Sequence, residues 1–277
     1  MVLGLHDRKI GLRDVSCIPI NLKTAGSVFE ILQRIQPEVV VHTAGLTNVE
    51  ACEQNPELAR EINVTLARNV AQATKQTGIK LVHISTDHLF DGSKPNVSED
   101  EPLAPLNVYG KTKGDAENEV LSVNENALIV RTNFYGWGPS YRSSFSDMII
   151  NNLRAKKVIT LFDDVFYTSI LADNLITTTH ELIDRDASGI YHVVGDERIS
   201  KYGFGLKIAE EFGVDPALII PRSIGSNPNL VKRPLDMSLS NLKVRSFLSK
   251  KIGSADEHIT RLKQQELSVA SQEIMKL

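Results

Sequence analysis

The first half of the chain alternates short β-branched runs with longer segments in which apolar residues recur at helical spacing. Strands are predicted at 16–22, 38–45 and 79–87, with a helix at 25–35 between the first two. A longer helix is predicted at 56–77, because its apolar residues keep to one face. Strands that alternate with helices in this way indicate an α/β fold built on a parallel sheet.

The second half begins with the same pattern and then loosens. A further strand is predicted at 126–136, and beyond residue 156 a strand is predicted at 189–195 and a helix at 201–213. The stretch 219–234 is expected to be mostly irregular, and the polar residues 255–277 are expected to form a solvated terminal helix. One α/β domain with a smaller appended lobe fits this pattern and a length of 277 residues.

Charge and cysteine content narrow the classes of partner and compartment. A formal net charge of -3 gives no basic excess for nucleic acid or an anionic membrane, so a small molecule or another protein is the expected partner. The two cysteines, Cys17 and Cys52, have no metal-ligand spacing and no disulfide framework, which indicates a reducing compartment. Without an apolar run of about 20 residues, the protein is expected to be soluble and cytoplasmic.

The stretch "NVYGKTK" at 107–113 places Tyr109 four residues before Lys113, at the start of a predicted helix. Residues at this spacing lie on one helix face, where an ammonium group can lower the pKa of a phenol. A lowered pKa would suit the phenol to acid–base chemistry, because its unperturbed pKa is about 10. Taken alone, the pair fits an ordinary surface tyrosine and lysine at least as well.

The stretch "STDHLFDG" at 85–92 follows a predicted central strand. Open parallel sheets bind their ligands at the carboxyl ends of the strands, so a hydroxyl of Ser85 or Thr86 could hydrogen-bond a substrate carbonyl there. The alternative is that these side chains only satisfy local backbone groups at the strand end. Together with "NVYGKTK", the functional reading is favoured.

These segments resemble a known superfamily. The order and spacing of "VVVHTAGLTNVEACEQNPELAREIN", "HISTDHLFDG", "PLNVYGKTKGDAE", "IVRTNFYG" and "GIYHVVGDERISKYGF" are similar to the extended short-chain dehydrogenase/reductases, above all the dTDP-4-dehydrorhamnose reductase branch. The resemblance implies a Rossmann-type doubly wound parallel sheet, NADPH or NADH as hydride carrier, and a nucleotide-linked 4-keto-6-deoxy-sugar as substrate. It divides the chain into an incomplete dinucleotide-binding Rossmann-type domain at 1–156 and a mixed α/β substrate-binding lobe with the polar terminal helix at 157–277, and it allows the chain to cross between the two.

The resemblance also implies roles for individual residues. Thr86 would polarise the sugar ketone, Tyr109 would donate its proton, and Lys113 would lower the pKa of Tyr109 and bind the nicotinamide ribose. The other matched positions would contact either the cofactor or the substrate. Together with Tyr109 and Lys113, the residues implied to bind the cofactor are Asn21, Leu22, Gly45, Leu46 and Thr47. Together with Thr86, the residues implied to bind the substrate are Asp87, His88 and Phe134.

The chain departs from the family pattern at several positions. The family usually has aspartate at Asn21, tyrosine at His88 and tryptophan at Phe134. His88 could itself act in acid–base chemistry, although a histidine at a strand end more often packs or hydrogen-bonds. The motif "GFG" that ends at Gly205 lacks a third glycine in register and is expected to pack a helix against its neighbour.

The largest departure concerns the glycine-rich loop that should hold the cofactor pyrophosphate. The match begins near the second strand of the family fold, so the first strand, the glycine turn and the first helix, roughly 25 residues, are expected to be missing. If the chain is complete, weak or no dinucleotide binding is predicted, because the helix N-terminus that binds phosphate is lost. A shortened version of a longer enzyme and a naturally shortened member are both open.

Two functions therefore stand side by side. The first is an NAD(P)H-dependent reductase of a nucleotide-linked 4-keto-sugar. The second is a non-catalytic regulatory or binding subunit, resembling the regulatory β subunit of methionine adenosyltransferase. The missing loop favours the second reading, whereas Thr86, Tyr109 and Lys113 favour the first. A homodimer or a complex with a partner enzyme is compatible with either.

Overall fold

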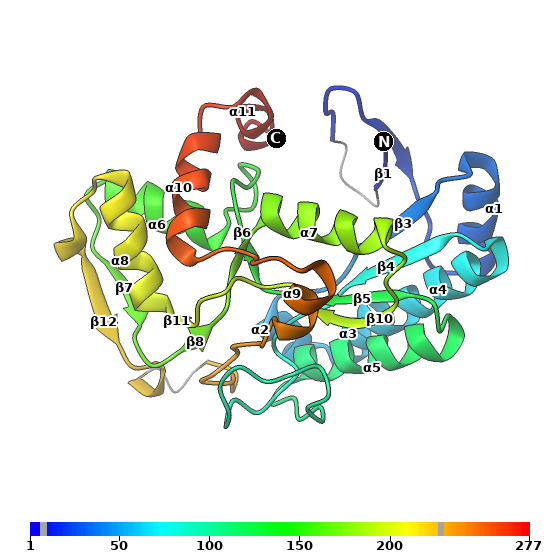
Figure 1. The fold of residues 1–277 in the computed structure, drawn as a ribbon, viewed down its shortest axis with the longest axis horizontal. Coiled ribbons are helices and arrows are strands. Elements are labelled where there is room, and N and C mark those ends of the chain that lie inside the picture. Colours follow the sequence, from blue (N-terminus) through cyan, green and yellow to red (C-terminus); the bar gives the residue numbers. More distant parts are fainter. Residues whose placement is uncertain (6–9, 227–229) are drawn as a thin grey trace.

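A computed structural model describes residues 1–5, 10–226 and 230–277 of the chain. Its centre is a four-stranded parallel sheet with the order β10-β5-β4-β3 (Figure 1). The strands are β3 (Val39–His42), β4 (Lys80–Ile84), β5 (Leu128–Arg131) and β10 (Gly189–His192). The predicted parallel sheet is confirmed, and its outer strand β10 comes from the second half of the chain.

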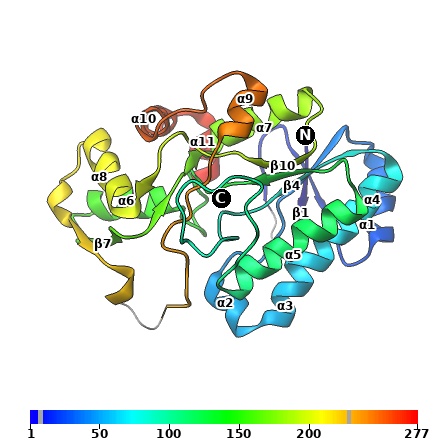
Figure 2. The same cartoon turned by 60° about the horizontal axis from the view of Figure 1, so that its bottom comes forward.

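Helices cover both faces of this sheet. Figure 2 shows the helices of one layer lying side by side on one face of the sheet. Figure 1 shows the helices of the other layer on the opposite face. The first layer is α1 (Ala25–Ile35), α4 (Leu66–Thr77) and α5 (Val108–Val123), and the second is α7 (Ala172–Asp184) and α9 (Leu242–Leu248). This doubly wound arrangement confirms the Rossmann-type fold, and α1 has the bounds that the apolar pattern predicts.

Alternation along the strands sends neighbouring residues into two separate cores. Leu81 of β4 packs with the first helix layer, whereas the next residue, Val82, packs with α7 and α9. Ile129 and Val130 of β5 divide in the same way. Side chains of a strand point to opposite faces, and both faces are buried here, so these strands read as continuous apolar runs.

The helix predicted at 56–77 contains a local widening. It runs through α3 (Pro56–Arg60), a π-helical turn (Glu61–Thr65) and α4. The extra residue of the π turn turns Asn63 inward, where its side chain is 1% exposed. Apolar periodicity does not reveal such a turn, because the spacing on either side of it is helical.

The amino-terminal segment forms a strand that the pattern did not predict. β1 (Val2–Leu5) pairs in parallel with β2 (Ser16–Pro19) as a separate two-stranded sheet. Within the described ranges, β1 pairs only with β2, and β3 pairs only with β4. A cavity of about 710 Å³ lies between β1 and β3 and is lined largely by apolar residues of these strands and of α1.

The remaining segments form a smaller lobe around Phe204, which is fully buried. Its short sheets pair β12 with β7, β11 with β8 and β6 with β9. Its strands and helices are β6 (Phe134–Tyr135), α6 (Phe145–Arg154), β7 (Ile159–Phe162), β8 (Phe166–Tyr167), β9 (Ile170–Leu171), β11 (Ile199–Ser200), α8 (Lys201–Phe212), β12 (Ile219–Arg222), α10 (Ala255–Gln265) and α11 (Val269–Met275). The division of the chain at residue 156 stays a prediction.

One expectation for this lobe needs correction. Residues 255–277 form two helices, and α10 buries His258, Ile259 and Leu262 against the lobe, so it is not a freely solvated helix. The stretch 219–234 begins with the strand β12, which pairs with β7, and its other described residues are irregular apart from a 3-10 turn at Ile224–Ser226. None of the helices within the described ranges is long and apolar enough to cross a membrane.

Candidate functional site

The start of α5 lies against the loop that follows β4. Asn107 caps the helix, since its side-chain oxygen accepts a hydrogen bond of 2.9 Å from the backbone N–H of Gly110. A Cβ atom at Gly110 would lie 2.3 Å from the carbonyl oxygen of His88, so only glycine permits this approach. The close approach brings Tyr109 beside the "STDH" segment at 85–88.

Tyr109 is buried where the start of α5 meets the segment 85–88. Its ring meets the ring of His88 edge-on, with centroids 5.4 Å apart. Burial raises the pKa of Tyr109 to about 12, although a hydrogen bond with Thr86 acts to lower it. The expected lowering of this pKa by Lys113 is absent, because burial outweighs other effects and Lys113 is hydrogen-bonded elsewhere. The phenol therefore holds its proton at neutral pH, as a proton donor must.

Lys113 follows Tyr109 by one helical turn and points to the sheet. Its Nζ atom donates a hydrogen bond of 2.8 Å to the carbonyl oxygen of Ile84 and lies 3.3 Å from Nε2 of His83. Burial lowers the pKa of Lys113 to about 8, against the opposing effect of Glu117. The lysine thus remains mostly cationic at neutral pH and can lose its proton within one pH unit of neutrality.

Thr86 and Asp87 end β4 beside Tyr109, and both side chains are buried. The Thr86 hydroxyl lies 3.3 Å from Oδ1 of Asp87, to which it donates. The other carboxylate oxygen of Asp87 accepts a hydrogen bond of 2.5 Å from the side-chain amide of Asn133. These bonds fix the orientation of the threonine hydroxyl next to the tyrosine.

The segment 45–47 runs past this group after β3. Asn63 holds it in place, because its side chain accepts from the Leu46 N–H at 2.7 Å and donates to the Leu46 carbonyl at 3.1 Å. The same amide reaches Thr112 on α5, so the π turn ties the segment to the helix of Tyr109. Thr47 accepts a hydrogen bond of 2.5 Å from Arg142 of the other lobe.

Asn21 and Leu22 lie at the far end of the same region. Both line the large cavity between β1 and β3, as does Gly45. For a nicotinamide dinucleotide, Leu22 offers an apolar surface and Asn21 offers an amide on this wall, while Tyr109 and Lys113 offer polar donors in the buried group, outside the lining of the cavity. The residues present therefore fit the two ends of such a cofactor, while the sequence offers no glycine-rich turn for its pyrophosphate.

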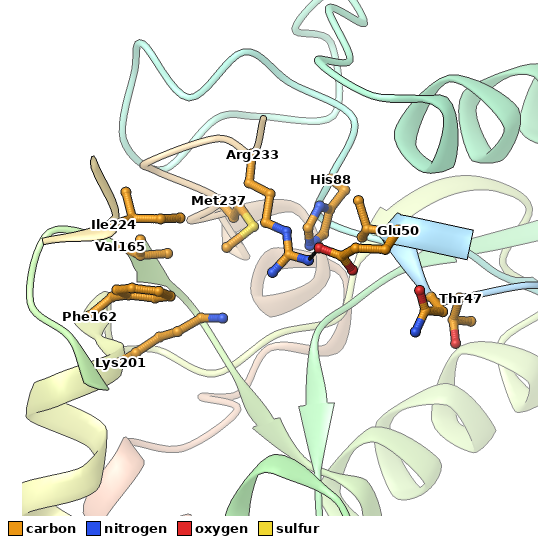
Figure 3. Close-up of a pocket in the computed structure, with 11 residues that line it drawn as sticks. Thr47, Glu50, His88, Phe162, Val165, Lys201, Ile224, Arg233 and Met237 are labelled. Atoms are coloured by element: carbon orange, nitrogen blue, oxygen red, sulfur yellow. Dashed lines mark hydrogen bonds and ion pairs between the residues drawn. The ribbon is translucent and has the colours of Figure 1, made fainter. Parts of the chain in front are cut away.

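A second pocket, of about 280 Å³, opens between the two lobes beside His88 (Figure 3). Lys201 at the start of α8 and Arg233 extend into it from different sides. Arg233 forms an ion pair with Glu50 on the pocket wall, and Thr47 also lines the pocket. Burial lowers the pKa of Lys201, although Asp87 nearby raises it. Two cationic side chains in a confined pocket suit an anionic ligand such as a diphosphate.

The structure brings five of the predicted residues to the walls of these two cavities. Thr86, Asp87, Tyr109 and Lys113 form one buried group that lines neither cavity, and the half-buried His88 lies between this group and the pocket. Asn21, Leu22 and Gly45 line the large cavity, Leu46 lies in the segment beside it, and Thr47 lines the pocket. Phe134 is the outlier because, unlike the buried group, its side chain is 55% exposed on β6, and it lines neither cavity.

Sequence reasoning missed four residues of this region, Lys201, Arg233, His42 and His83. Lys201 and Arg233 come from segments more than 80 residues after Tyr109, and no local spacing connects them with it. The signal for His42 was present, because "VVVH" and "LVH" place His42 and His83 at matching positions of neighbouring strands.

Comparison with known proteins identifies the family. The chain is 36% identical to the probable low-salt glycan biosynthesis reductase of Haloferax volcanii, over 79% of this chain and 74% of that protein. It is 30% identical to methionine adenosyltransferase 2 subunit beta of Xenopus laevis, over 79% and 69% of the two chains. The structure of dTDP-4-dehydrorhamnose reductase from Bacillus anthracis in complex with NADP superimposes with a TM-score of 0.84 at 27% identity, covering 91% and 90%.

The predicted relationship to the dTDP-4-dehydrorhamnose reductases is thereby confirmed. The model of the RmlD substrate binding domain matches residues 5–267, which span both lobes and all the site residues described above. The chain belongs to the RmlD substrate-binding domain family.

Proposed function

We propose that this protein is an NAD(P)H-dependent reductase of a nucleotide-linked 4-keto-6-deoxy-sugar. The observation that carries the proposal is the burial of Thr86, Tyr109 and Lys113 in one group, beside a pocket that holds two cations. The family relationship supports the same reading, because the relatives include proteins named as reductases and the NADP complex of the Bacillus anthracis enzyme.

Each residue of the group has a distinct task in this reaction. The Thr86 hydroxyl would turn its proton from Asp87 Oδ1 to the ketone oxygen, and Tyr109 Oη would give that oxygen a proton. The ammonium of Lys113, which hydrogen-bonds the Ile84 carbonyl in this structure, would bind the nicotinamide ribose through a charge-assisted hydrogen bond. The bound cofactor would supply a hydride to the ketone carbon, with its ribose beside Lys113.

The pocket between the lobes is proposed to hold the nucleotide part of the substrate. Lys201 and Arg233 would bind the diphosphate, and the aromatic ring of Phe162 in the same wall offers an apolar surface. His88 would separate the diphosphate from Tyr109 and keep the sugar over the phenol, since its ring contacts both the pocket and Tyr109.

The test is oxidation of NADPH or NADH in the presence of a dTDP-linked 4-keto-6-deoxy-sugar. The proposal expects cofactor oxidation that is lost in Tyr109→Phe, while the variant folds as the wild type. A melting temperature that rises with NADPH would report binding separately from chemistry. No oxidation and no shift at millimolar NADPH or NADH would overturn the proposal.

A second candidate function is a non-catalytic subunit that binds a partner enzyme. The sequence likeness to methionine adenosyltransferase 2 subunit beta favours it. Under this reading, Tyr109→Phe would leave the activity of a co-purifying enzyme unchanged. The buried pairing of Tyr109 with Thr86 speaks for the reductase instead, since a binding subunit has no need of it.

A further inference from the structure

A row of three buried side chains leads from the candidate site to the cavity between β1 and β3. The Lys113 Nζ atom lies 3.3 Å from Nε2 of His83, and Nδ1 of His83 lies 2.9 Å from Nδ1 of His42. The two imidazole rings are stacked, with centroids 5.1 Å apart and planes inclined by 29°. All three side chains are at most 5% exposed.

The last atom of the row has no partner among the described residues. His42 Nε2 is buried without a hydrogen bond, and His42 is one of the residues that line the cavity. A buried polar atom in this position costs free energy unless water or a ligand satisfies it. The cavity has room for water next to this atom.

Hydrogen-bond chemistry fixes the protons along the row. A lysine ammonium can only donate, so His83 Nε2 accepts and the proton of neutral His83 lies on Nδ1. That N–H donates to Nδ1 of His42, which leaves the proton of neutral His42 on Nε2, toward the cavity. Both rings are neutral at pH 7, because burial and the charge of Lys113 lower their pKa values.

We propose that Lys113, His83 and His42 form a proton relay between the candidate site and the water of the cavity. When Lys113 loses a proton, His83 Nε2 takes it, and His83 Nδ1–H passes its proton to His42 Nδ1. His42 Nε2–H then releases one proton to water, so one proton enters and one leaves the row. The reverse sequence returns a proton to Lys113. The further transfer from Lys113 to Tyr109 rests on the proposed function.

Among the described residues, the charges that act on this row come from Glu117 and from the members of the row themselves. Glu117, one turn after Lys113 on α5, is the carboxylate whose charge acts on Lys113, and it favours the ammonium. From the strands, the charge of Lys113 acts on both histidines, and His42 acts on His83. The relay therefore predicts that the two imidazoles change tautomer together as Lys113 titrates, near pH 8.

Side-chain NMR of the ¹⁵N-labelled protein tests the relay without cofactor or substrate. At pH 6.5 the relay expects His83 protonated on Nδ1 and His42 on Nε2, and above the Lys113 titration it expects the opposite nitrogen of each ring to be protonated. Lys113→Met should abolish the change in both rings. His192 is an internal control, because its Nδ1 faces the Ser240 carbonyl and its Nε2 faces Arg131, so its tautomer should stay the same.

The relay is overturned if both rings keep their tautomers while Lys113 titrates, or if they change equally in Lys113→Met. In the active protein, a conservative substitution of His42 distinguishes a role in proton transfer from a role in holding its neighbours in position. His42→Gln keeps a donor and an acceptor but cannot pass a proton, so the relay expects about a tenfold lower kcat with KM unchanged. Full kcat in His42→Gln would overturn it. Because the NMR measurement needs no turnover, loss of the proposed function and loss of the relay give different results.

Discussion

Glu117 and Arg131 form an ion pair of 2.7 Å in which the two side chains are 1% and 2% exposed. The same carboxylate accepts a hydrogen bond of 2.5 Å from Ser85, one residue before Thr86. Glu117 lies on α5 and Arg131 ends β5, so the pair joins the helix of Tyr109 to the strand ends of the sheet. The position of the candidate catalytic group therefore depends on a buried charge pair.

Removing the carboxylate should destabilise the fold strongly. Glu117→Ala is expected to lower the free energy of unfolding by about 3–5 kcal/mol, because the charge of Arg131 would stay buried without its partner. Urea unfolding measures this change. Asp115→Asn is the matched control on the same helix, since it breaks an exposed pair with Arg60 and should cost less than about 1 kcal/mol. Similar losses in both variants would contradict this account of the pair.

The hydroxyl of Thr86 is expected to act on the substrate rather than on the fold. Thr86→Val keeps the shape of the side chain, and we expect kcat/KM to fall by about 10²–10³-fold because the ketone loses a hydrogen-bond donor. Thr86→Ser keeps the hydroxyl and should retain most of the activity. Steady-state kinetics of both variants check the prediction, which fails if serine and valine have the same effect.

Substitutions in the pocket between the lobes are expected to weaken binding of the sugar nucleotide separately from the chemical step. Lys201→Gln and Arg233→Gln should each raise KM for the sugar nucleotide about 10–100-fold, because a charge-assisted hydrogen bond to a diphosphate is lost. The melting-temperature shift caused by NADPH should not change in either variant. Lys207→Gln is the control on the same helix, since Lys207 pairs with Asp256 away from the pocket. An unchanged KM in Lys201→Gln and Arg233→Gln would contradict the assignment.

The titration of Lys113 predicts a stability change at alkaline pH. The pKa of Lys113 falls from 10.5 to about 8 on folding, so between these values the unfolded chain binds more protons than the folded chain. Stability then rises with pH across this window, by up to about 3 kcal/mol, relative to a variant without the group. Unfolding free energies of the wild type and Lys113→Met from pH 7.5 to 10.5 measure the difference. A constant difference across this window would show that Lys113 keeps its ordinary pKa.

Much of the fold follows from local sequence patterns. The apolar spacing predicts α1 with its observed bounds, and the β-branched runs predict β3, β4 and β5. β1 was missed because it is a short run of four residues with little contrast to its surroundings. The π turn was missed because its effect, the inward turn of Asn63, depends on contacts with Leu46 and Thr112 that are distant in the sequence.

The candidate site was predictable only in part for the same physical reason. Thr86, Tyr109 and Lys113 lie within 28 residues, and their motifs mark a strand end and a helix start. Lys201 and Arg233 reach the pocket through the packing of the second lobe, which no local pattern encodes. The pKa of Tyr109 was expected to be lowered by the i, i+4 lysine, but the desolvation of a buried phenol dominates.

The central claim is that Tyr109 protonates a ketone that the nicotinamide cofactor reduces. Its most direct test is NADPH oxidation with a dTDP-linked 4-keto-6-deoxy-sugar, followed at saturating substrate in the wild type and in Tyr109→Phe. The account predicts stoichiometric conversion of the ketone to an alcohol by the wild type, and a kcat about 10²–10⁴-fold lower in Tyr109→Phe with unchanged thermal stability. Equal rates in the two proteins, or no conversion by a folded wild type that binds NADPH, would contradict it.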